Sequence, residues 1–547
     1  MQDTIHIRVG KQALHPVDGR LFGHFMERAS WGEPGYDFAR NAEHPERLDP
    51  QVVEKLEWMD IPVIRFPAGS DLKRIDWSDM IDNAPDRQGD RPIFADNKHG
   101  KLTNLFGIDE FLSLCEELGS EALLPVRFYP ALSGDVPPDK AAREAAELVA
   151  YCNAEIGAEL PEGMADWPAI RAQNGRPAPW KVRYFQIGNE TWTYYKSVRE
   201  KVGMDDNTPP EKIAKWYIQC LHAYIDAIRA VDPDVEIIID GTTNLGQEVD
   251  RLILSDNKLR REAQYAALHL YQPWGIRSIK KGEEEIPVGQ LSAEDIWYAW
   301  TTLPAIDPTT GFTTLDGHNK WQRTAEMGWP IAATEWNWNG WWRTPDSDGD
   351  PALNSRLAKG VGAAGMLHAF MRQGENVKIG CQSMLVGVSW DITGIRVGRD
   401  GEAPPHFHPT GLVTGFYSRH HGNERLPARV SHLPRYDQPY RMSGIKPASS
   451  AAAVDVVVTN SDDKVFIHAI NRHFSGPQAV QVHLEELKRK PVQIIHHRLT
   501  GRLSNKPTEK FPGAEAAIID QEEIEDIAPI FDAILPPRSV SIIEVTL

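Results

Sequence analysis

Short apolar runs that end in polar residues or glycine alternate with amphipathic helical patterns between about residue 20 and residue 424. Each run is apolar over most of its length, which is typical of strands that are buried on both faces of a parallel sheet. We interpret eight runs as strands, at residues 20–26, 61–66, 122–128, 183–189, 235–241, 265–270, 330–335 and 380–386.

Helical patterns separate these runs, and the clearest lies at about residues 210–230. Apolar residues recur there from Ile213 to Ile228 on a 3.6-residue period, and Asp232-Pro233 ends the pattern. Residues 138–157 show a similar pattern. Alternating strand and helix units predict a (β/α)8 TIM barrel with long loops. A doubly wound open sheet is the alternative, but no GxGxxG or GxxxxGK[ST] motif follows a strand.

From about residue 425 the pattern changes to short alternating runs separated by Gly, Pro, Asn and Asp, which predicts a C-terminal antiparallel β-sandwich. The segment TIHIRV at 4–9 also alternates, and we expect it to join the sandwich. The stretch 272–328 shows little periodicity and is interpreted as an active-site loop. The predicted domains are an N-terminal strand at 1–15, a catalytic barrel at 16–424 and a sandwich at 425–547.

Composition and charge narrow the classes of function. A chain of 547 residues is too long for one ordinary core. The net charge of −18 disfavours binding to nucleic acid or to an anionic membrane surface. No apolar window approaches the ~18 residues of a membrane span. We therefore predict neither a nucleic-acid partner nor a membrane partner.

The four cysteines are scattered without CxxC or zinc-type spacing, which predicts free thiols in a reducing compartment. The N-terminus lacks the basic and apolar regions of a signal peptide, so a cytoplasmic enzyme is expected, although a removed signal peptide would leave the same sequence. We find no cofactor motif. His406-Phe407-His408 lacks a third ligand of fitting spacing, and His496-His497 receives no function, so no metal site is predicted.

Two glutamates follow or end predicted strands. Glu190 comes directly after the fourth apolar run, and Glu335 ends the seventh. An isolated Glu in such a place is usually a surface residue, but the C-terminal ends of barrel strands converge on one face. Strands four and seven lie on roughly opposite sides of the ring, so both side chains can face one cleft. Two carboxyl groups flanking one bond are what glycoside hydrolysis requires.

The motifs FQIGNE and ATEWNWN around these glutamates resemble the acid/base and nucleophile motifs of clan A glycoside hydrolases. The pattern is most similar to family 51, the α-L-arabinofuranosidases. Other segments match the family in order along nearly the whole chain: LFGHFMER at 21–28, RFPAGSDLKRIDW at 65–77, LHLYQ at 268–272, GCQSML at 380–385 and LPPRSVSIIEV near the C-terminus. The resemblance implies a retaining mechanism with Glu190 as general acid/base and Glu335 as nucleophile.

The resemblance also implies which side chains surround the substrate. Asn189 would bond the sugar 2-hydroxyl, and Arg65 would hold Glu335 ionised. The family's Gly-Gly-Asn reads Ala68-Gly69-Ser70 here, so the shorter Ser70 or the adjacent Asp71 would replace the Asn. Four Trp within 336–342 depart from the family's pattern. The expected substrate contacts are Glu27, Arg65, Ser70, Asp71, Asn189, His269, Tyr271, Trp336 and Gln382.

The function expected from this resemblance is that of an exo-acting α-L-arabinofuranosidase. It would remove furanosyl residues from plant or algal polysaccharides or oligosaccharides by double displacement, without a cofactor. Another clan A specificity, an endo-glycanase or a galactosidase, is the alternative that the extra aromatic residues favour, since an extended chain needs several stacking platforms. A non-catalytic carbohydrate-binding protein is the second alternative. Because family members are often homo-oligomers, we expect a homo-oligomer here.

Overall fold

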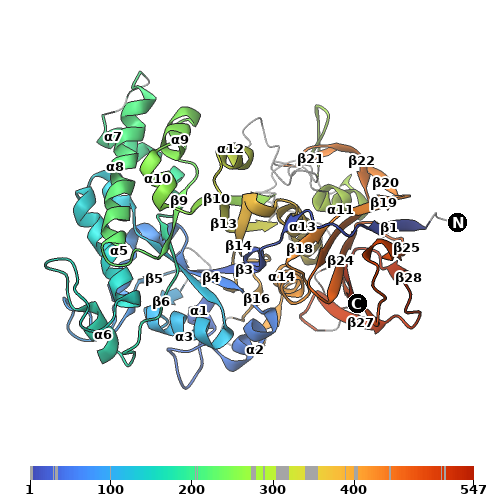
Figure 1. Cartoon of the computed structure of the whole chain (residues 1–547), viewed down its shortest axis with the longest axis horizontal. Helices are drawn as coiled ribbons and strands as arrows, with labels where there is room; N and C mark the ends of the chain where they lie inside the picture. Colours follow the sequence, from blue (N-terminus) through green and yellow to red (C-terminus); the bar gives the residue numbers. More distant parts are fainter. Residues whose placement is uncertain are drawn as a thin grey trace.

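The computed structural model describes residues 4–547 except 29, 31–34, 99, 204, 206, 273–278, 288–289, 303–319, 339–354, 389, 399–403, 443–444, 505, 507 and 511–512. The barrel and the sandwich lie side by side, and both chain termini lie at the sandwich end of the molecule (Figure 1). The barrel carries both glutamates.

The barrel is a closed ring of eight parallel strands in the order β10-β13-β14-β3-β4-β7-β8-β9. Every strand overlaps one of the predicted apolar runs, which confirms the (β/α)8 prediction, and closure of the ring excludes the doubly wound open sheet. The strands are β3 (Gly23–Glu27), β4 (Val63–Ala68), β7 (Glu121–Val126), β8 (Tyr184–Ile187), β9 (Glu236–Asp240), β10 (Tyr265–Gln272), β13 (Ile331–Trp338) and β14 (Val377–Gln382).

Helices cover the barrel, and the helix that the sequence predicts most clearly buries one face. In α8 (Pro210–Arg229) the buried residues run from Ile213 to Ile228 along the predicted stripe, while Trp216 is only half-buried. Helix α5 (Pro138–Asn153) packs beside α8 and begins at the residue that the sequence predicts. The other helices that cover the barrel are α1 (Gly35–Phe38), α2 (Pro50–Met59), α3 (Ile108–Leu118), α4 (Tyr129–Ser133), α6 (Trp167–Gln173), α7 (Tyr195–Lys201), α9 (Gln247–Leu254), α10 (Asn257–Glu262), α13 (Arg356–Met371) and α14 (Pro409–Arg419).

The sandwich consists of a seven-stranded and a four-stranded sheet, in the orders β2-β18-β23-β24-β29-β26-β27 and β19-β1-β25-β28. Strand β1 (Ile5–Val9) lies between β19 and β25, so the N-terminal segment pairs within the sandwich. Apolar residues of both sheets, Ile7, Val482 and Ile543 among them, form the core between the sheets. The strands are β2 (His15–Pro16), β18 (Glu424–Leu426), β19 (Ala428–Ser431), β23 (Val454–Asn460), β24 (Lys464–Asn471), β25 (Gln478–His483), β26 (Gln493–Gly501), β27 (Ala517–Glu523), β28 (Ile530–Leu535) and β29 (Ser539–Thr546).

The stretch 272–328 differs from the simple loop that the sequence predicts, although 273–278 and 303–319 of it lie outside the described residues. It contains β11 (Ile279–Lys281), β12 (Glu284–Ile286), α11 (Ala293–Thr301) and α12 (Lys320–Glu326). Strand β11 pairs with β21 (Tyr440–Met442), which is distant in the chain. Pairing between distant segments therefore forms strands that local periodicity does not predict. Short elements elsewhere are β5 (Ala95–Asn97), β6 (Gly100–Leu102), β15 (Val386–Gly387), β16 (Ile395–Arg396), β17 (His406–Phe407), β20 (Arg435–Gln438) and β22 (Ala448–Ala452).

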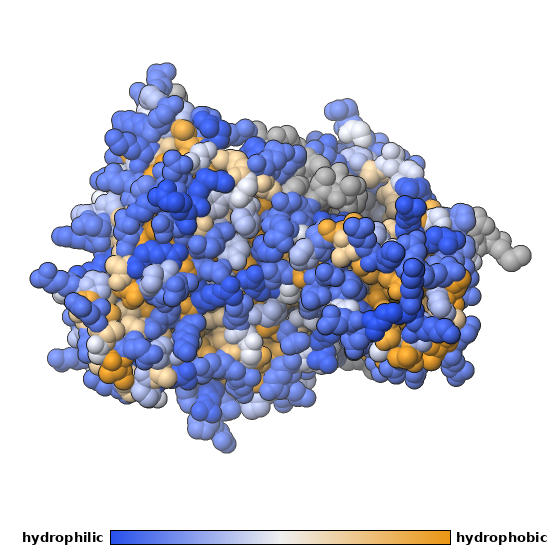
Figure 2. Space-filling view, viewed as in Figure 1, coloured by the Kyte–Doolittle hydropathy of each residue, from blue (hydrophilic) through white to orange (hydrophobic). Residues whose placement is uncertain are grey.

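The surface is mostly hydrophilic in the view of Figure 2, with apolar side chains gathered over the sandwich on the right. Exposed large apolar residues of the sandwich include Val492, Ile518, Ile527, Ile530 and Ile534. In the part of the chain that the structure describes, none of the helices has the length and apolar character to cross a membrane. All four cysteines are buried and unpaired.

Candidate active site

Glu190 stands at a sharp turn after β8. Its φ is 49°, and Gly188 two residues earlier has a φ of 85°. A Cβ on Gly188 would lie 2.8 Å from Cγ2 of Thr191 and 3.2 Å from Cβ of Phe128, so the turn needs glycine there. The turn leaves the side chain of Glu190 22% exposed at the mouth of the barrel.

The segment after Glu190 is anchored by the neighbouring strand. Asp240, at the end of β9, accepts a 2.8 Å hydrogen bond from the backbone N–H of Thr191. The Tyr217 hydroxyl donates to Oγ1 of Thr191 at 2.7 Å. Burial raises the pKa of the Asp240 carboxyl, and the hydrogen bonds from Thr191 oppose that rise. Asp240 and Tyr217 thus hold the backbone that carries Glu190.

Glu335 lies within β13 and is held by two donors. Nη1 of Arg65 lies 2.9 Å from its Oε1, and the Tyr271 hydroxyl donates to its Oε2 at 2.8 Å. The Glu335 side chain is 6% exposed. Burial first, and next the charge of Glu335, hold the pKa of the Tyr271 hydroxyl well above its usual range, so Tyr271 remains a donor.

Arg65 on β4 connects Glu335 to the acid/base side of the barrel. It is fully buried, and its Nε donates to Oε1 of Gln186 at 2.8 Å. Its Nη2 donates to Oδ1 of Asn189 at 2.5 Å. This contact orients the amide of Asn189 beside Glu190. One planar guanidinium therefore sets the positions of both strand ends.

His269 on β10 lies between the two glutamates. Its Nδ1 is 3.1 Å from Oε1 of Glu190 and 3.5 Å from Oε2 of Glu335. With the proton on Nδ1, the ring donates to Glu190 while the Thr334 hydroxyl donates to Nε2 at 3.0 Å. One atom from each of Glu190, His269 and Glu335 lies within 4.8 Å of the others, a spacing that would also suit a metal ion. Arg65 and Tyr271 contact the two carboxylate oxygens of Glu335.

Glu27 ends β3 and is buried near the same group. A Cβ added to Gly69 would overlap the Glu27 carboxylate, so the glycine of the second-strand motif leaves room for Glu27. The Glu27 charge also contributes to the raised pKa of Tyr271, after burial and Glu335. The barrel thus gathers Glu27, Arg65, Asn189, His269 and Tyr271 around the two glutamates.

Two predicted substrate contacts lie elsewhere. Trp336 is fully buried and packs edge-on against Phe370 of α13, with ring centroids 5.3 Å apart, because alternation along β13 points it outward when Glu335 points inward. Gln382 is turned outward in the same way, and its Oε1 accepts a 2.6 Å hydrogen bond from Thr414 of α14. The predicted sugar contacts of Trp336 and Gln382 are therefore wrong.

The structure also differs from the expectation that Ser70 or Asp71 takes the place of the Asn in the family's Gly-Gly-Asn motif. Asp71 accepts hydrogen bonds from the backbone N–H of Ser30 at 2.6 Å and from the Ser30 hydroxyl at 3.1 Å, and it pairs with Arg74. These contacts hold the Asp71 carboxylate within its own loop. Ser70 is exposed at the start of the short helix Ser70–Arg74. Trp341 and Trp342 of the predicted aromatic cluster lie outside the described residues, and Trp338 is fully buried.

Sequence reasoning missed three residues that support the site: Asp240, Gln186 and Thr334. Each is a polar residue at or near the carboxyl end of an apolar run, as Glu335 is. That signal could have identified Asp240, which ends the run at 235–241. For Gln186 and Thr334 the signal does not reveal the partner, since their roles arise from contacts with Arg65 and His269 on other strands.

Comparison with known proteins agrees with this geometry. The model of the alpha-L-arabinofuranosidase 1 domain matches residues 55–284. A probable alpha-L-arabinofuranosidase C of Aspergillus flavus is 32% identical over 196 residues, which cover 35% of this chain and 33% of that protein. The match thus spans about a third of the length of that relative. The intracellular exo-alpha-(1->5)-L-arabinofuranosidase 1 of Bacillus subtilis is 23% identical over 445 residues, 77% of this chain and 76% of that protein.

Among solved structures, the family 51 α-L-arabinofuranosidase of Thermotoga petrophila superposes with a TM-score of 0.69 at 20% identity, covering 99% of this chain and 100% of that one. This likeness concerns the fold, which is a barrel with a sandwich in both. The matched domain includes Glu190, the relatives are named as arabinofuranosidases, and the solved structure shares the fold, so the chain is similar to α-L-arabinofuranosidases in sequence and in architecture.

Proposed function

We propose that this protein is a retaining glycoside hydrolase of the exo-acting α-L-arabinofuranosidase type, with Glu190 as general acid/base and Glu335 as nucleophile. The observation that carries the proposal is the close approach of the two carboxylates, whose facing oxygens lie within 4.8 Å of each other and of His269. Carboxyl groups about 5–5.5 Å apart serve double displacement, whereas inverting enzymes separate them by about 6.5–9.5 Å to admit a water.

The surroundings of the two carboxylates support different roles. Glu335 is nearly buried and receives both Arg65 and Tyr271, so its charge is stabilised and its attack direction is fixed. Glu190 is more exposed, and His269 is its side-chain partner at 3.1 Å. A carboxyl group with this lighter restraint can hold a proton and release it to a leaving group.

The reaction then follows from these positions. The Glu190 carboxyl donates its proton to the glycosidic oxygen while Glu335 attacks the anomeric carbon, which breaks the glycosidic bond and forms a glycosyl ester on Glu335. Glu190, now a carboxylate, removes a proton from water as that water attacks the same carbon and releases Glu335. Asn189, oriented by Arg65, bonds the 2-hydroxyl, a contact that strengthens in the transition state.

The substrate is proposed to be a non-reducing-end furanosyl residue on a plant or algal polysaccharide or oligosaccharide. The relatives named as arabinofuranosidases and the motif LHLYQ around His269 and Tyr271 support this choice. Trp192, next to the acid/base, stands edge-on to His269 with ring centroids 5.0 Å apart. Its indole offers a stacking surface on the leaving-group side of Glu190.

The decisive test combines a substrate panel with variants of the nucleophile. We expect the enzyme to hydrolyse 4-nitrophenyl α-L-arabinofuranoside much faster than the matching xyloside and galactosides, and to release arabinose from arabinan. NMR of the first product formed should show the α-anomer, since double displacement retains configuration. Glu335→Ala and the isosteric Glu335→Gln should both lose activity by about 10⁴-fold or more.

Near-normal hydrolysis by Glu335→Ala would refute the mechanism. A wild-type enzyme that cleaves internal bonds of xylan or galactan and ignores the arabinofuranoside would keep the mechanism and assign the endo-glycanase or galactosidase specificity. Binding of arabinan without release of product from any glycoside would indicate a carbohydrate-binding protein.

We also propose a cytoplasmic location, supported by the four buried, unpaired cysteines and by the Bacillus subtilis relative that is named as intracellular. Cell fractionation of the native source tests it. Homo-oligomerisation stays a prediction, to be measured by light scattering of the purified chain.

A further inference from the structure

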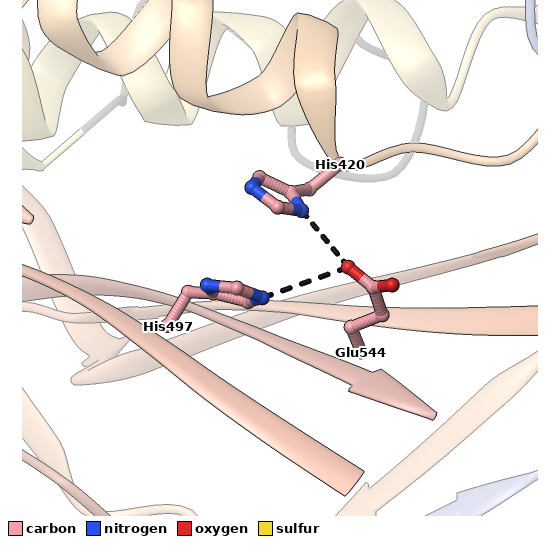
Figure 3. A group of neighbouring side chains, drawn as sticks. All are labelled: His420, His497 and Glu544. Atoms are coloured by element: carbon pink, nitrogen blue, oxygen red, sulfur yellow. Dashed lines mark hydrogen bonds and ion pairs between the residues drawn. The ribbon is translucent and has the colours of Figure 1, made fainter. Parts of the chain in front are cut away.

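Two histidines and a glutamate meet between the barrel and the sandwich, far along the chain from the catalytic glutamates. Nδ1 of His420 lies 2.9 Å from Oε2 of Glu544, and Nε2 of His497 lies 3.5 Å from the same oxygen. Figure 3 shows both rings directed at this carboxylate. One atom from each residue lies within 4.8 Å of the others.

The fold brings these residues together from separate elements. His420 directly follows α14 of the barrel, while His497 and Glu544 lie on the adjacent antiparallel strands β26 and β29. In the register of these strands Ile495 opposes Glu544, so His497, two residues on, shares a face of the sheet with Glu544. That face is the one on which the end of α14 packs.

The two histidines contact the carboxylate unequally. His420 hydrogen-bonds the Glu544 carboxylate. Nε2 of His497 is buried and lies 3.5 Å from the same carboxylate oxygen, a longer contact than that of His420. A buried ring nitrogen with only a long contact costs stability unless something else binds it. This nitrogen is therefore a candidate ligand for a group that accepts its lone pair, such as a metal ion.

The geometry points to a metal ion. We propose that His420, His497 and Glu544 form a binding site for a divalent transition-metal ion of the Zn²⁺ type that joins the barrel to the sandwich. Two imidazole nitrogens and one carboxylate oxygen are a ligand set that Zn²⁺ takes in proteins. With bonds of about 2.0–2.1 Å, tetrahedral ligands stand about 3.3 Å apart. The two ligand-to-ligand distances given above, 2.9 and 3.5 Å, bracket this spacing.

A pocket lies beside the two histidines. His420 and His497 line a pocket of about 460 Å³ together with Trp58, Phe416 and Gln521. A water molecule in this pocket can complete a tetrahedral site. Because imidazole suits Zn²⁺ and related ions and not the oxygen-preferring Mg²⁺ or Ca²⁺, the site should discriminate against the latter two.

Lys464 on β24 limits the affinity of the site. Its Nζ lies 2.6 Å from Oε1 of Glu544, so the second carboxylate oxygen is occupied and a positive charge stands beside the proposed ion. Removing that charge should strengthen binding of a cation, since like charges a few ångströms apart repel strongly near a protein surface. A cluster that served only as a hydrogen-bonded contact would not gain metal affinity in this way.

The experiment titrates metal-depleted full-length protein with ZnCl₂ by isothermal titration calorimetry, with MgCl₂ and CaCl₂ as comparison ions. We expect Zn²⁺ binding that His420→Asn and His497→Asn each abolish. Binding should persist in His44→Asn, a change of an exposed histidine, and in Glu335→Gln, which alters the other group of suitable spacing. Zn²⁺ should also raise the Tm of the wild type and not that of the two ligand variants.

Lys464→Met provides the variant that keeps all three ligands. It should bind Zn²⁺ about tenfold or more tightly than the wild type. Co²⁺ bound to either protein should show the visible absorption of a tetrahedral nitrogen and oxygen site. The proposal is overturned if the wild type and Lys464→Met bind no Zn²⁺, or if the ligand variants bind it as the wild type does. Loss of binding in Glu335→Gln alone would show that the ion binds at the catalytic glutamates instead.

Discussion

The mouth of the barrel and the interface between barrel and sandwich both hold carboxylates near histidine and arginine side chains. The two regions differ in how many partners bind each carboxylate. At the interface, Asp455 of β23 is bound by Arg372, which directly follows α13, and accepts a 3.0 Å hydrogen bond from Nδ1 of His368 on α13. At the mouth, Glu190 has His269 as its side-chain partner and is 22% exposed. The same residue types stabilise the fold in one region and leave a reactive group accessible in the other.

The difference teaches that the number of charged partners, and not exposure alone, separates the structural carboxylate of Asp455 from Glu190, the carboxyl group proposed to transfer a proton. Arg372, followed by His368, holds the pKa of the Asp455 carboxyl well below its usual range against the opposing effect of burial. The Tyr417 hydroxyl in turn donates to Nε2 of His368 at 2.8 Å, which completes the group. Such a carboxylate is ionised, fixed and unable to transfer a proton near neutral pH. The comparison can be tested in both regions.

Among the tests of this comparison, the largest effect is expected for Glu190→Ala. Hydrolysis of substrates with poor leaving groups should fall by about 10²–10⁴-fold, because proton donation is lost. Formation of the glycosyl-enzyme from a 2,4-dinitrophenyl glycoside should change much less, since that leaving group needs no proton. Stopped-flow release of dinitrophenol measures the first step, and Glu190→Gln is the matched variant. An equal loss with both substrates would contradict the acid role.

At the interface, Asp455→Asn should lower the free energy of unfolding by about 3–5 kcal/mol, because it leaves a buried guanidinium without its counter-charge. The folded-state pKa of Asp455 is lowered, so this stabilisation is present above the unfolded pKa of about 4 and is lost as pH falls below it. The difference from wild type should therefore be full at pH 7 and narrow below about pH 4. Urea unfolding across this range measures it.

The control for that change is Asp462→Asn, which alters an exposed residue of the same sandwich. It should leave the unfolding curve nearly unchanged at every pH. An Asp455→Asn variant as stable as the wild type at pH 7 would show that Asp455 does not stabilise the interface.

A smaller effect is expected for Tyr271→Phe. It removes one hydrogen bond to an ionised carboxylate, worth about 1.5–3 kcal/mol, so kcat/KM should fall by about 10–100-fold. The free energy of unfolding should change by less than about 1 kcal/mol, because Arg65 still holds Glu335. Steady-state kinetics and thermal unfolding give the two values. A large loss of stability without loss of activity would place Tyr271 with the structural residues.

The smallest effect belongs to Asp240, a positioning residue that acts through Thr191. Asp240→Ala should lower kcat about fivefold with KM nearly unchanged, since one net hydrogen bond of about 1 kcal/mol orients the Glu190 turn. Asp240→Asn should restore most of the activity, because its amide oxygen can still accept from the Thr191 N–H. Equal losses in both variants would show that the charge of Asp240 matters instead.

Much of this arrangement could be predicted from local pattern. Apolar runs located all eight barrel strands, and the strand ends identified Glu190 and Glu335, because a buried parallel strand must be apolar and its exit need not be. Trp336 and Gln382 were assigned wrongly because their motif positions match a family pattern while the alternation of β13 and β14 turns both side chains toward the helices. Side chains along a strand alternate between its two faces, so the face of a given residue depends on the residue at which the strand begins. A short motif does not specify that residue.

The sequence by itself determined the barrel, the sandwich and the two glutamates, since these depend on periodicity and on residue type at strand ends. Only the tertiary structure decided which partners those carboxylates have. Arg65, Asn189 and Glu335 come from three separate barrel strands or their exits, and His420, His497 and Glu544 from a helix end and two sandwich strands. Contacts between residues this far apart follow from closure of the ring and from packing of the two domains, which no local pattern encodes.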